Sequence, residues 1–427
     1  MGAFDKVIGY EQIKDELLQV CDMLKNREVY ESLGAKLPRG ILLHGDPGLG
    51  KTLMAECFIE ESGLKSYIVR RAKGKEEFVK HVANVFHEAK ENAPAIVLLD
   101  DMDKFANEDE VHQNAEEYVA VQAGIDACKG YEVLVIATTN DMNKLPESLI
   151  RPGRFDKKIA VNCPTNEEAD ALITHFLSDK RVGADINVED LAKMMKHISC
   201  AELESVLNNA AIAAASKRRG CIYMDDLVES VLQSCYGMEV ISHNKQSDES
   251  IRKLALHEAG HLVVAEVLEP ESIGLVSIRS REVVIGGSNG FVKRCKPASN
   301  RRKEALITLA GKAATELYYS ETCASGCSED LEHAYSMICD GICESGTHGL
   351  GFIQGYYGVT QDLKRQVETI VRAEMERYMF RTREILLKNR AFLEKVTDAL
   401  IEKEILLFSD IREIRESVEV VENGSFS

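Results

Sequence analysis

The sequence predicts an α/β core, a small helical region after it, and a mostly α-helical C-terminal domain. Three observations lead to this fold class. Apolar segments at residues 40–44, 95–99 and 133–137, each followed by polar residues, predict the strands of an α/β sheet. A glycine-rich motif follows the first segment, where such a sheet would meet its next helix. An H-E-x-x-H motif lies inside an apolar helical run of the second half.

Composition limits the classes of protein to which this chain can belong. A length of 427 residues is enough for about two to four domains. The net charge of −18 argues against a nucleic-acid partner. No apolar run approaches the ~20 residues of a membrane span, and the N-terminus does not read as a signal peptide. Because the twelve cysteines form no extracellular framework, we expect a cytoplasmic chain without a membrane span.

The first candidate site begins with GDPGLGKT at residues 45–52, which fits the pattern G-x-x-x-x-G-K-T. In this motif backbone N–H groups surround the phosphates of a nucleotide, and the following helix adds its N-terminal dipole. Lys51 is expected to reach the β- and γ-phosphates, and the Thr52 hydroxyl to ligate magnesium. The residues expected to contact Mg·ATP are Asp46, Pro47, Gly48, Leu49, Gly50, Lys51, Thr52 and Leu53.

Polar residues after the next two apolar segments extend this candidate site. The second segment ends in Asp100 and Asp101, the arrangement of a Walker B motif, with Asp100 on the magnesium side. Asn140 follows the third segment and could orient the attacking water. Arg151 and Arg154 belong to the loop RPGRFD, and loop arginines can act as fingers on the γ-phosphate of a neighbouring subunit. Taken singly, either arginine could instead form a surface salt bridge.

The second candidate site is the pentad HEAGH at residues 257–261. Residues four apart on a helix lie on one face, so His257 and His261 can each offer a ring nitrogen to one ion. A catalytic zinc needs two such ligands, a third from elsewhere and an open position for water. Zinc lowers the pKa of that water, and Glu258 lies where it could accept the proton. The alternative is a helix that carries two histidines without a metal.

The order of these motifs resembles that of AAA+ ATPases. The loop RPGRFD followed by HEAGH is similar to the FtsH family of ATP-dependent zinc proteases, and the resemblance extends from Phe4 through the C-terminal helices. It implies an α/β P-loop AAA+ ATPase core at residues 1–164 and a helical lid at residues 165–236. It also implies a mostly α-helical zinc metalloprotease domain at residues 237–427.

The same resemblance assigns roles to residues of the first site. It places Ile8 and Gly9 against the adenine of the nucleotide. It makes Asn140 a sensor of the γ-phosphate and makes Arg151 and Arg154 fingers that act in a neighbouring subunit. A finger needs a neighbour's nucleotide, so we expect a homo-oligomeric ring with six subunits.

The third zinc ligand also comes from the resemblance. The segment SGCSEDL at residues 325–331 resembles the family's Thr-Gly-Ala-x-x-Asp segment, which opens a helix and supplies an aspartate. This resemblance nominates Asp330. Glu329 and His333 are rivals within reach of the same turn, and acids near a helix start are often caps.

Two cysteine pairs, Cys323/Cys327 and Cys339/Cys343, each have i, i+4 spacing. A thiolate zinc site is conceivable, but structural zinc sites favour other spacings, so we interpret these cysteines as buried or redox-silent thiols.

Three features depart from the family's pattern. Glu normally follows the Walker B aspartate, and Asp101 is one methylene shorter. Because a misplacement of about 1 Å can cost ~100-fold in rate, we expect slow ATP hydrolysis unless the loop compensates. The segment 70–75 stands where the family has an aromatic pore residue, and it is basic. The family's N-terminal membrane segments are absent, so we expect a soluble relative or a shortened chain.

Other elements expected are a helix at residues 11–24, short strands at 274–280 and 283–293, and helices throughout 361–416. The two strands could form an edge that holds substrate as an added strand, or an ordinary hairpin.

These features together predict an ATP-dependent zinc endopeptidase with zinc, ATP and magnesium as cofactors. It would move polypeptide substrates by ATP hydrolysis and cleave them in a ring-shaped chamber. Two alternatives stay open. One is a zinc peptidase in which the nucleotide mainly supports ring assembly. The other is an ATP-driven protein remodeller with a structural zinc site.

Overall fold

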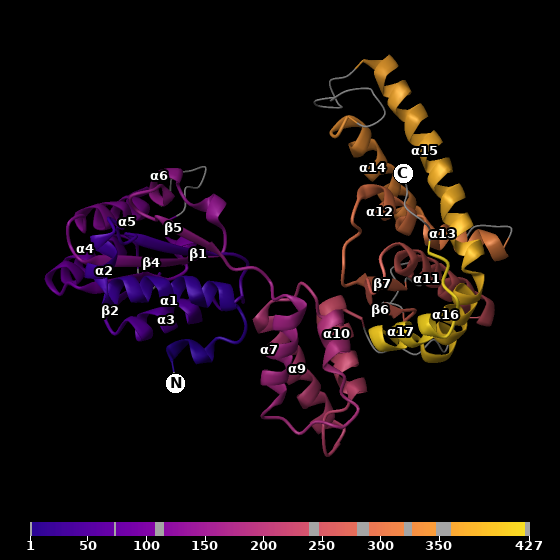
Figure 1. Cartoon of the computed structure of the whole chain (residues 1–427), viewed down its shortest axis with the longest axis horizontal. Coiled ribbons are helices and arrows are strands. Elements are labelled where there is room, and N and C mark those ends of the chain that lie inside the picture. The colour runs from indigo at the N-terminus through magenta and orange to yellow at the C-terminus, as the bar shows by residue number, and fades with distance from the viewer. Residues whose placement is uncertain are drawn as a thin grey trace. The chain divides into compact units, whose positions relative to one another are not determined.

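A computed structural model describes most of the chain as two compact units (Figure 1). The first unit contains Met1–Lys180 and His197–Asn208, and the second contains Arg181–Lys196 and Asn209–Ser427. None of the described helices is long and apolar enough to cross a membrane. The bounds predicted for core, lid and protease domains stay a prediction. The residues described are 2–71, 74–106, 115–238, 247–279, 290–319, 327–346 and 360–422.

The first unit contains a five-stranded sheet in the order β2-β3-β4-β1-β5, in which every neighbouring pair is parallel. The strands expected at residues 40–44 and 95–99 are confirmed, and the third expected strand continues to Thr139. The strands are β1 (Gly40–His44), β2 (Lys65–Val69), β3 (Ala95–Leu99), β4 (Val133–Thr139) and β5 (Lys157–Ala160).

Helices cover both faces of this sheet. Successive residues of a strand point to opposite faces, so Ile41 and Leu43 pack with α1 and α3, whereas Leu42 packs with α4 and α5. Burial on both faces explains why the strands are apolar at every position rather than at alternate ones. The covering helices are α1 (Glu11–Lys25), α3 (Lys51–Ser62), α4 (Lys75–Glu91) and α5 (Ala115–Ala127).

Shorter elements complete the first unit. A capping box begins α7, because Thr165 accepts from the backbone N–H of Glu168 and the Glu168 carboxylate accepts from that of Thr165. These elements are η1 (Ala3–Lys6), α2 (Arg27–Ser32), η2 (Met102–Lys104), η3 (Met142–Lys144), α6 (Glu147–Ile150), α7 (Asn166–Leu177) and the start of α9 (Cys200–Ser216).

The second unit is mostly helical and is organised around α11 (Asp248–Leu268), which packs against α13 and α16. A Cβ on Gly260 would lie 2.5 Å from the carbonyl oxygen of Ala310, so a glycine is required where α11 approaches α13. The other helices are α8 (Val188–Met194), α10 (Met224–Tyr236), α12 (Arg301–Thr308), α13 (Ala310–Tyr318), α14 (Ser328–Cys343), α15 (Gln361–Lys388), α16 (Arg390–Lys403) and α17 (Phe408–Glu416).

A small antiparallel sheet in the order β7-β6-β8 also belongs to this unit. Its strands are β6 (Ile273–Ser277), β7 (Phe291–Arg294) and β8 (Ile405–Leu407). The expectation of helices throughout 361–416 is wrong at β8. A three-residue apolar run fits either helix or strand by pattern alone, and here the edge of β6 supplies the pairing partner. Part of the second expected strand lies outside the described residues.

Candidate functional site

The H-E-x-x-H residues lie on α11, one turn apart, and face the first turn of α14. Nε2 of His257 and Nε2 of His261 are 3.2 Å apart. The Oδ2 atom of Asp330 lies 3.3 Å from the first and 3.2 Å from the second. In the described part of the chain, these three residues are the group of His, Cys, Asp and Glu side chains that could hold a metal. Glu329 and His333 are exposed and lie outside this cluster.

The spacing of these three atoms fits a zinc ion. Zn–N and Zn–O bonds of about 2.0–2.1 Å in a tetrahedron place neighbouring ligand atoms about 3.3 Å apart. Asp330 Oδ2 is buried and accepts no hydrogen bond from the described residues. A buried carboxylate oxygen that faces two ring nitrogens is costly unless a proton or cation lies between them. The donor set and its geometry therefore fit three protein ligands of one zinc ion.

Neighbouring backbone orients the two imidazoles. Nδ1 of His261 lies 2.8 Å from the carbonyl oxygen of Ile307, a bond that requires a proton on Nδ1 and leaves Nε2 free for a metal. Gly311 on α13 faces both rings, and a Cβ there would lie 2.4 Å from His257 and 2.5 Å from His261. Neither Ile307 nor Gly311 belongs to a sequence motif. Cys327 is buried as predicted, with its sulfur 3.9 Å from Nδ1 of His257.

The charges at this centre are strongly coupled. Burial raises the pKa of Glu258, and the two imidazoles oppose that rise. Burial would raise the pKa of Asp330 and lower that of His261, but their mutual attraction reverses both shifts, so the pKa of Asp330 is lowered and that of His261 raised. A Cβ on Gly290 would lie 2.7 Å from Oε1 of Glu258. The chain entering β7 therefore passes directly beside this carboxylate.

The residues predicted for the nucleotide site gather at the carboxyl ends of β1, β3 and β4. The ammonium group of Lys51 donates to two carbonyls of the phosphate loop and, at 2.9 Å, to Oδ1 of Asn140. Burial lowers the pKa of Lys51, although nearby carboxylates oppose the shift. The Thr52 hydroxyl donates to Oδ1 of Asp100 at 2.8 Å. The phosphate loop, the Walker B acid and the predicted sensor are thus in direct contact.

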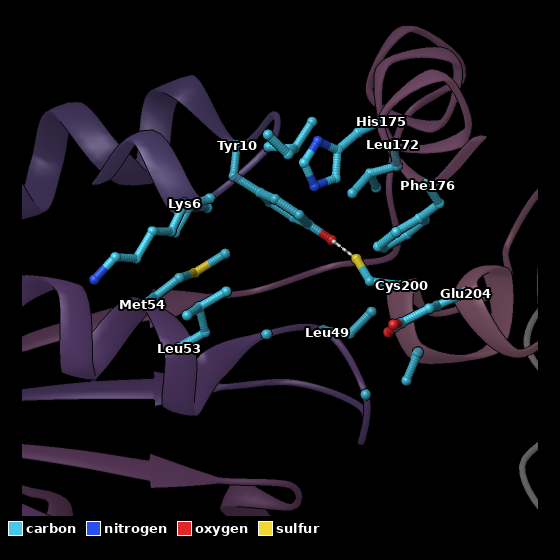
Figure 2. A pocket seen from close by; sticks show the side chains of 15 residues that line it. Lys6, Tyr10, Leu49, Leu53, Met54, Leu172, His175, Phe176, Cys200 and Glu204 are labelled. Carbon is cyan, nitrogen blue, oxygen red and sulfur yellow. Dashed lines mark hydrogen bonds between the residues drawn. The ribbon is translucent and has the colours of Figure 1, made fainter. Parts of the chain in front are cut away.

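A cavity of about 310 Å³ adjoins the phosphate loop (Figure 2). Ile8 lines it, and Gly9 makes a turn nearby with φ +73°. Their contact with the adenine stays a prediction. Tyr10 also lines it, although no motif predicted this; its hydroxyl donates to the carbonyl of Asn162 and lies 3.4 Å from the sulfur of Cys200. Five lining residues on α7 and α9 were likewise not predicted; these are Leu172, His175, Phe176, Cys200 and Glu204.

The second Walker B acid, Asp101, forms an ion pair within its own turn. Asp101 has a left-handed backbone with φ 55°, and its Oδ2 lies 2.6 Å from the ammonium group of Lys104. Asp103 lies closer to the sensor, because its Oδ1 accepts from the backbone N–H of Asn140 at 3.1 Å and from the hydroxyl of Thr139. The role of Asp101 as the water-polarising group stays a prediction.

The two arginines of the RPGRFD loop have different surroundings. Arg151 is exposed. Arg154 is 3 % exposed, and its guanidinium donates to Asp126 at 2.6 Å and to the carbonyl of Ser148. Arg154 and then Lys129 hold the pKa of Asp126 down to about 2. The roles of Arg151 and Arg154 as fingers stay predictions.

Both sites together define a class of protein, an AAA+ ATPase joined to a zinc metallopeptidase. Three family models match the chain. "ATPase family associated with various cellular activities (AAA)" matches residues 41–163, "AAA+ lid domain" matches 185–229, and "Peptidase family M41" matches 244–414.

Named relatives agree with these family models. "ATP-dependent zinc metalloprotease FtsH" of Caldicellulosiruptor bescii is 31% identical over 96% of this chain and 71% of the relative. "ATP-dependent zinc metalloprotease FtsH 3" of Symbiobacterium thermophilum is 29% identical over 97% of this chain and 71% of the relative. The chain belongs to the FtsH family of ATP-dependent zinc metalloproteases. The predicted fold class and enzyme class are confirmed, and the roles of individual residues stay predictions.

Proposed function

We propose that this chain hydrolyses ATP to move polypeptides to a zinc centre, where they are cleaved, and that it does so as a ring of six identical subunits. The observation that carries this proposal is the triangle of ligand atoms from His257, His261 and Asp330, with sides of 3.2–3.3 Å. The P-loop core of the same chain supplies the ATP-dependent part.

In the proposed peptidase reaction each residue of the centre has one task. A zinc ion held there would supply a Lewis acid that activates the attacking water and the scissile carbonyl. His257, His261 and Asp330 hold the ion. The Glu258 carboxylate accepts the proton of the attacking water and later donates it to the leaving amine. Burial raises the pKa of this carboxyl group.

We propose that substrate binds as an extended segment along β7. This strand lies at the edge of its sheet, and its entry passes against Glu258 at Gly290. An added strand gains main-chain hydrogen bonds that do not depend on substrate sequence. This arrangement suits an endopeptidase that cleaves many unfolded chains.

In the proposed ATPase reaction the nucleotide base occupies the cavity beside Ile8 and Tyr10. Lys51 binds the β- and γ-phosphates, and magnesium is held near the Thr52 hydroxyl and Asp100. Asn140, already bonded to Lys51, orients the attacking water.

Arg151 reaches the γ-phosphate of the neighbouring subunit, while Arg154, anchored to Asp126, holds the RPGRFD loop in shape. An arginine that acts on a neighbour's nucleotide requires an oligomer.

A second candidate function is favoured by one observation. The carboxylate of Asp101, the expected water-polarising group, is paired with the ammonium group of Lys104. If this pairing persists with nucleotide bound, the protein is a zinc peptidase in which ATP mainly holds the ring together.

Casein degradation separates the candidates. The full chain is assayed with Mg·ATP, with a non-hydrolysable analogue and without nucleotide, beside Lys51→Ala. Cleavage with Mg·ATP, but not with the analogue or without nucleotide, supports the proposal. Equal cleavage with Mg·ATP and with the analogue supports a zinc peptidase in which ATP mainly holds the ring together. If the protein binds zinc and hydrolyses ATP but cleaves casein in none of these conditions, it is an ATP-driven protein remodeller with a structural zinc site.

A further inference from the structure

Arg70 lies at the nucleotide site although no motif contains it. It is the residue after β2, and Asp100 is the residue after β3, the parallel neighbour of β2. Val69 pairs with Leu99 in register, and the backbone N–H of Asp100 donates to the carbonyl of Val69. Because parallel strands end at the same edge of a sheet, the two charged side chains emerge side by side.

The guanidinium group of Arg70 bonds directly to the Walker B carboxylate. Its Nε donates to Oδ2 of Asp100 at 2.8 Å, and its Nη2 donates to Oε1 of Glu56 at 3.2 Å. The other carboxylate oxygen, Oδ1, accepts from the hydroxyls of Thr52 and Thr138, each at 2.8 Å. Both lone pairs of Oδ1 are therefore in use. Oδ2, the atom left for a metal or a metal-bound water, is the one that Arg70 covers.

Asp100 needs a positive charge at this position. Its side chain is 8 % exposed, and a buried carboxylate is costly without a counter-charge. Lys51 does not supply it, because its ammonium group is bonded to loop carbonyls and to Asn140. Arg70 is the cation paired with Asp100 among the described residues. Its own side chain is 53 % exposed, so it can leave without opening the core.

We propose that Arg70 is a resident counter-cation at the magnesium position. It holds Oδ2 of Asp100 when no metal is bound, and Mg²⁺ must displace it to reach that oxygen. With ATP but no metal, a guanidinium held at the magnesium position would neutralise part of the phosphate charge. Arg70 therefore weakens the apparent affinity for Mg²⁺ and strengthens metal-free ATP binding. This inference rests on the proposed binding of Mg·ATP at this site.

The test measures ATP binding to the full chain by calorimetry, in EDTA and over a series of Mg²⁺ concentrations. Arg70→Gln should lower the Mg²⁺ concentration for half-maximal ATP binding about fivefold, which corresponds to about 1 kcal/mol for a half-exposed charged hydrogen bond. It should also weaken ATP binding in EDTA by a similar factor. For Arg70→Lys, which keeps the charge, both the half-maximal Mg²⁺ concentration and the ATP affinity in EDTA should lie between those of the parent and those of Arg70→Gln.

Lys65→Gln is the matched control. It removes one positive charge from the opposite end of β2, where Lys65 bonds to Asn92 and not to the site. It should leave both quantities unchanged. Equal Mg²⁺ dependence of the parent, Arg70→Gln and Arg70→Lys would overturn the inference while leaving the proposed function intact. A parent that binds no ATP at any Mg²⁺ concentration would instead overturn the proposed function. Should Arg70→Gln not fold, Arg70→Lys against the parent decides the matter.

Discussion

Replacing Gly311 by alanine tests the metal centre from outside its ligand set. The added Cβ would lie 2.4 Å from Cε1 of His257 and 2.5 Å from Nε2 of His261. Ordinary carbon contacts begin near 3.5 Å, so the rings must move by roughly 1 Å. Displacing groups that orient zinc ligands typically costs 10–100-fold in metal affinity. We therefore expect Gly311→Ala to bind zinc about 10–100-fold more weakly than the parent, and to lose peptidase activity where zinc dissociates.

Stability should change much less than zinc affinity. Alanine stabilises a helix interior by about 0.5–1 kcal/mol over glycine, and this offsets part of an overpacking cost of about 1–3 kcal/mol. The assay is zinc content and competition with a chelator, beside thermal unfolding of the metal-free protein. Gly220→Ala is the control, because nothing lies within 4 Å of its added Cβ. Zinc affinity of Gly311→Ala equal to that of the parent would refute the reasoning.

The remaining predictions concern three carboxylates. Glu258→Gln should keep zinc and ATPase activity but slow the cleavage of a fluorogenic peptide by ~10²–10⁴-fold; cleavage at the parent rate would exclude it as the base. Asp101→Asn should bind ATP but show no turnover in a steady-state ATPase assay. Undiminished turnover would exclude Asp101 as the water-polarising group and make Asp103 the candidate for that role. Asp126→Asn should lower the free energy of unfolding at pH 7 by about 1–3 kcal/mol, because it leaves buried Arg154 unpaired. The folded pKa of about 2 lies below the unfolded value of about 3.9, so this loss should be full above about pH 4 and vanish as the pH falls towards 2. Urea unfolding over that pH range checks it, and a pH-independent loss would contradict it.

Local patterns were enough to predict the parts of the site that lie close together in the chain. His257 and His261 share a helix face, and that spacing alone predicts a metal pair. The ends of β1, β3 and β4 were predictable because apolar runs stop there and polar residues follow. Local spacing does not predict Asp330 as a ligand, because it is 69 residues from His261. Pattern alone did not separate it from Glu329 and His333, and the family resemblance nominated it.

Tertiary packing decides the features that the sequence did not predict. Gly311 and Ile307 matter only because α12 and α13 pack beside α11, and neither residue type signals a metal site. The burial of Arg154 against Asp126 depends on a contact across 28 residues. The sequence pattern places Arg70 in a basic segment at the position of the pore loop, and nothing in that pattern predicts the bond between its guanidinium and Asp100. Arg71 of that segment is likewise paired, with buried Glu117.

X-ray absorption at the zinc K-edge of the full, zinc-loaded chain tests the metal centre most directly. The central claim is that two imidazoles and one carboxylate hold the ion. The predicted spectrum therefore has nitrogen and oxygen scatterers at about 2.0–2.1 Å, with the outer-shell pattern of two imidazoles and no sulfur. The sulfur of Cys327 is the competing ligand, because it lies 3.9 Å from the ring of His257. A sulfur shell at about 2.3 Å would contradict the assignment of Asp330 and the catalytic role of this zinc.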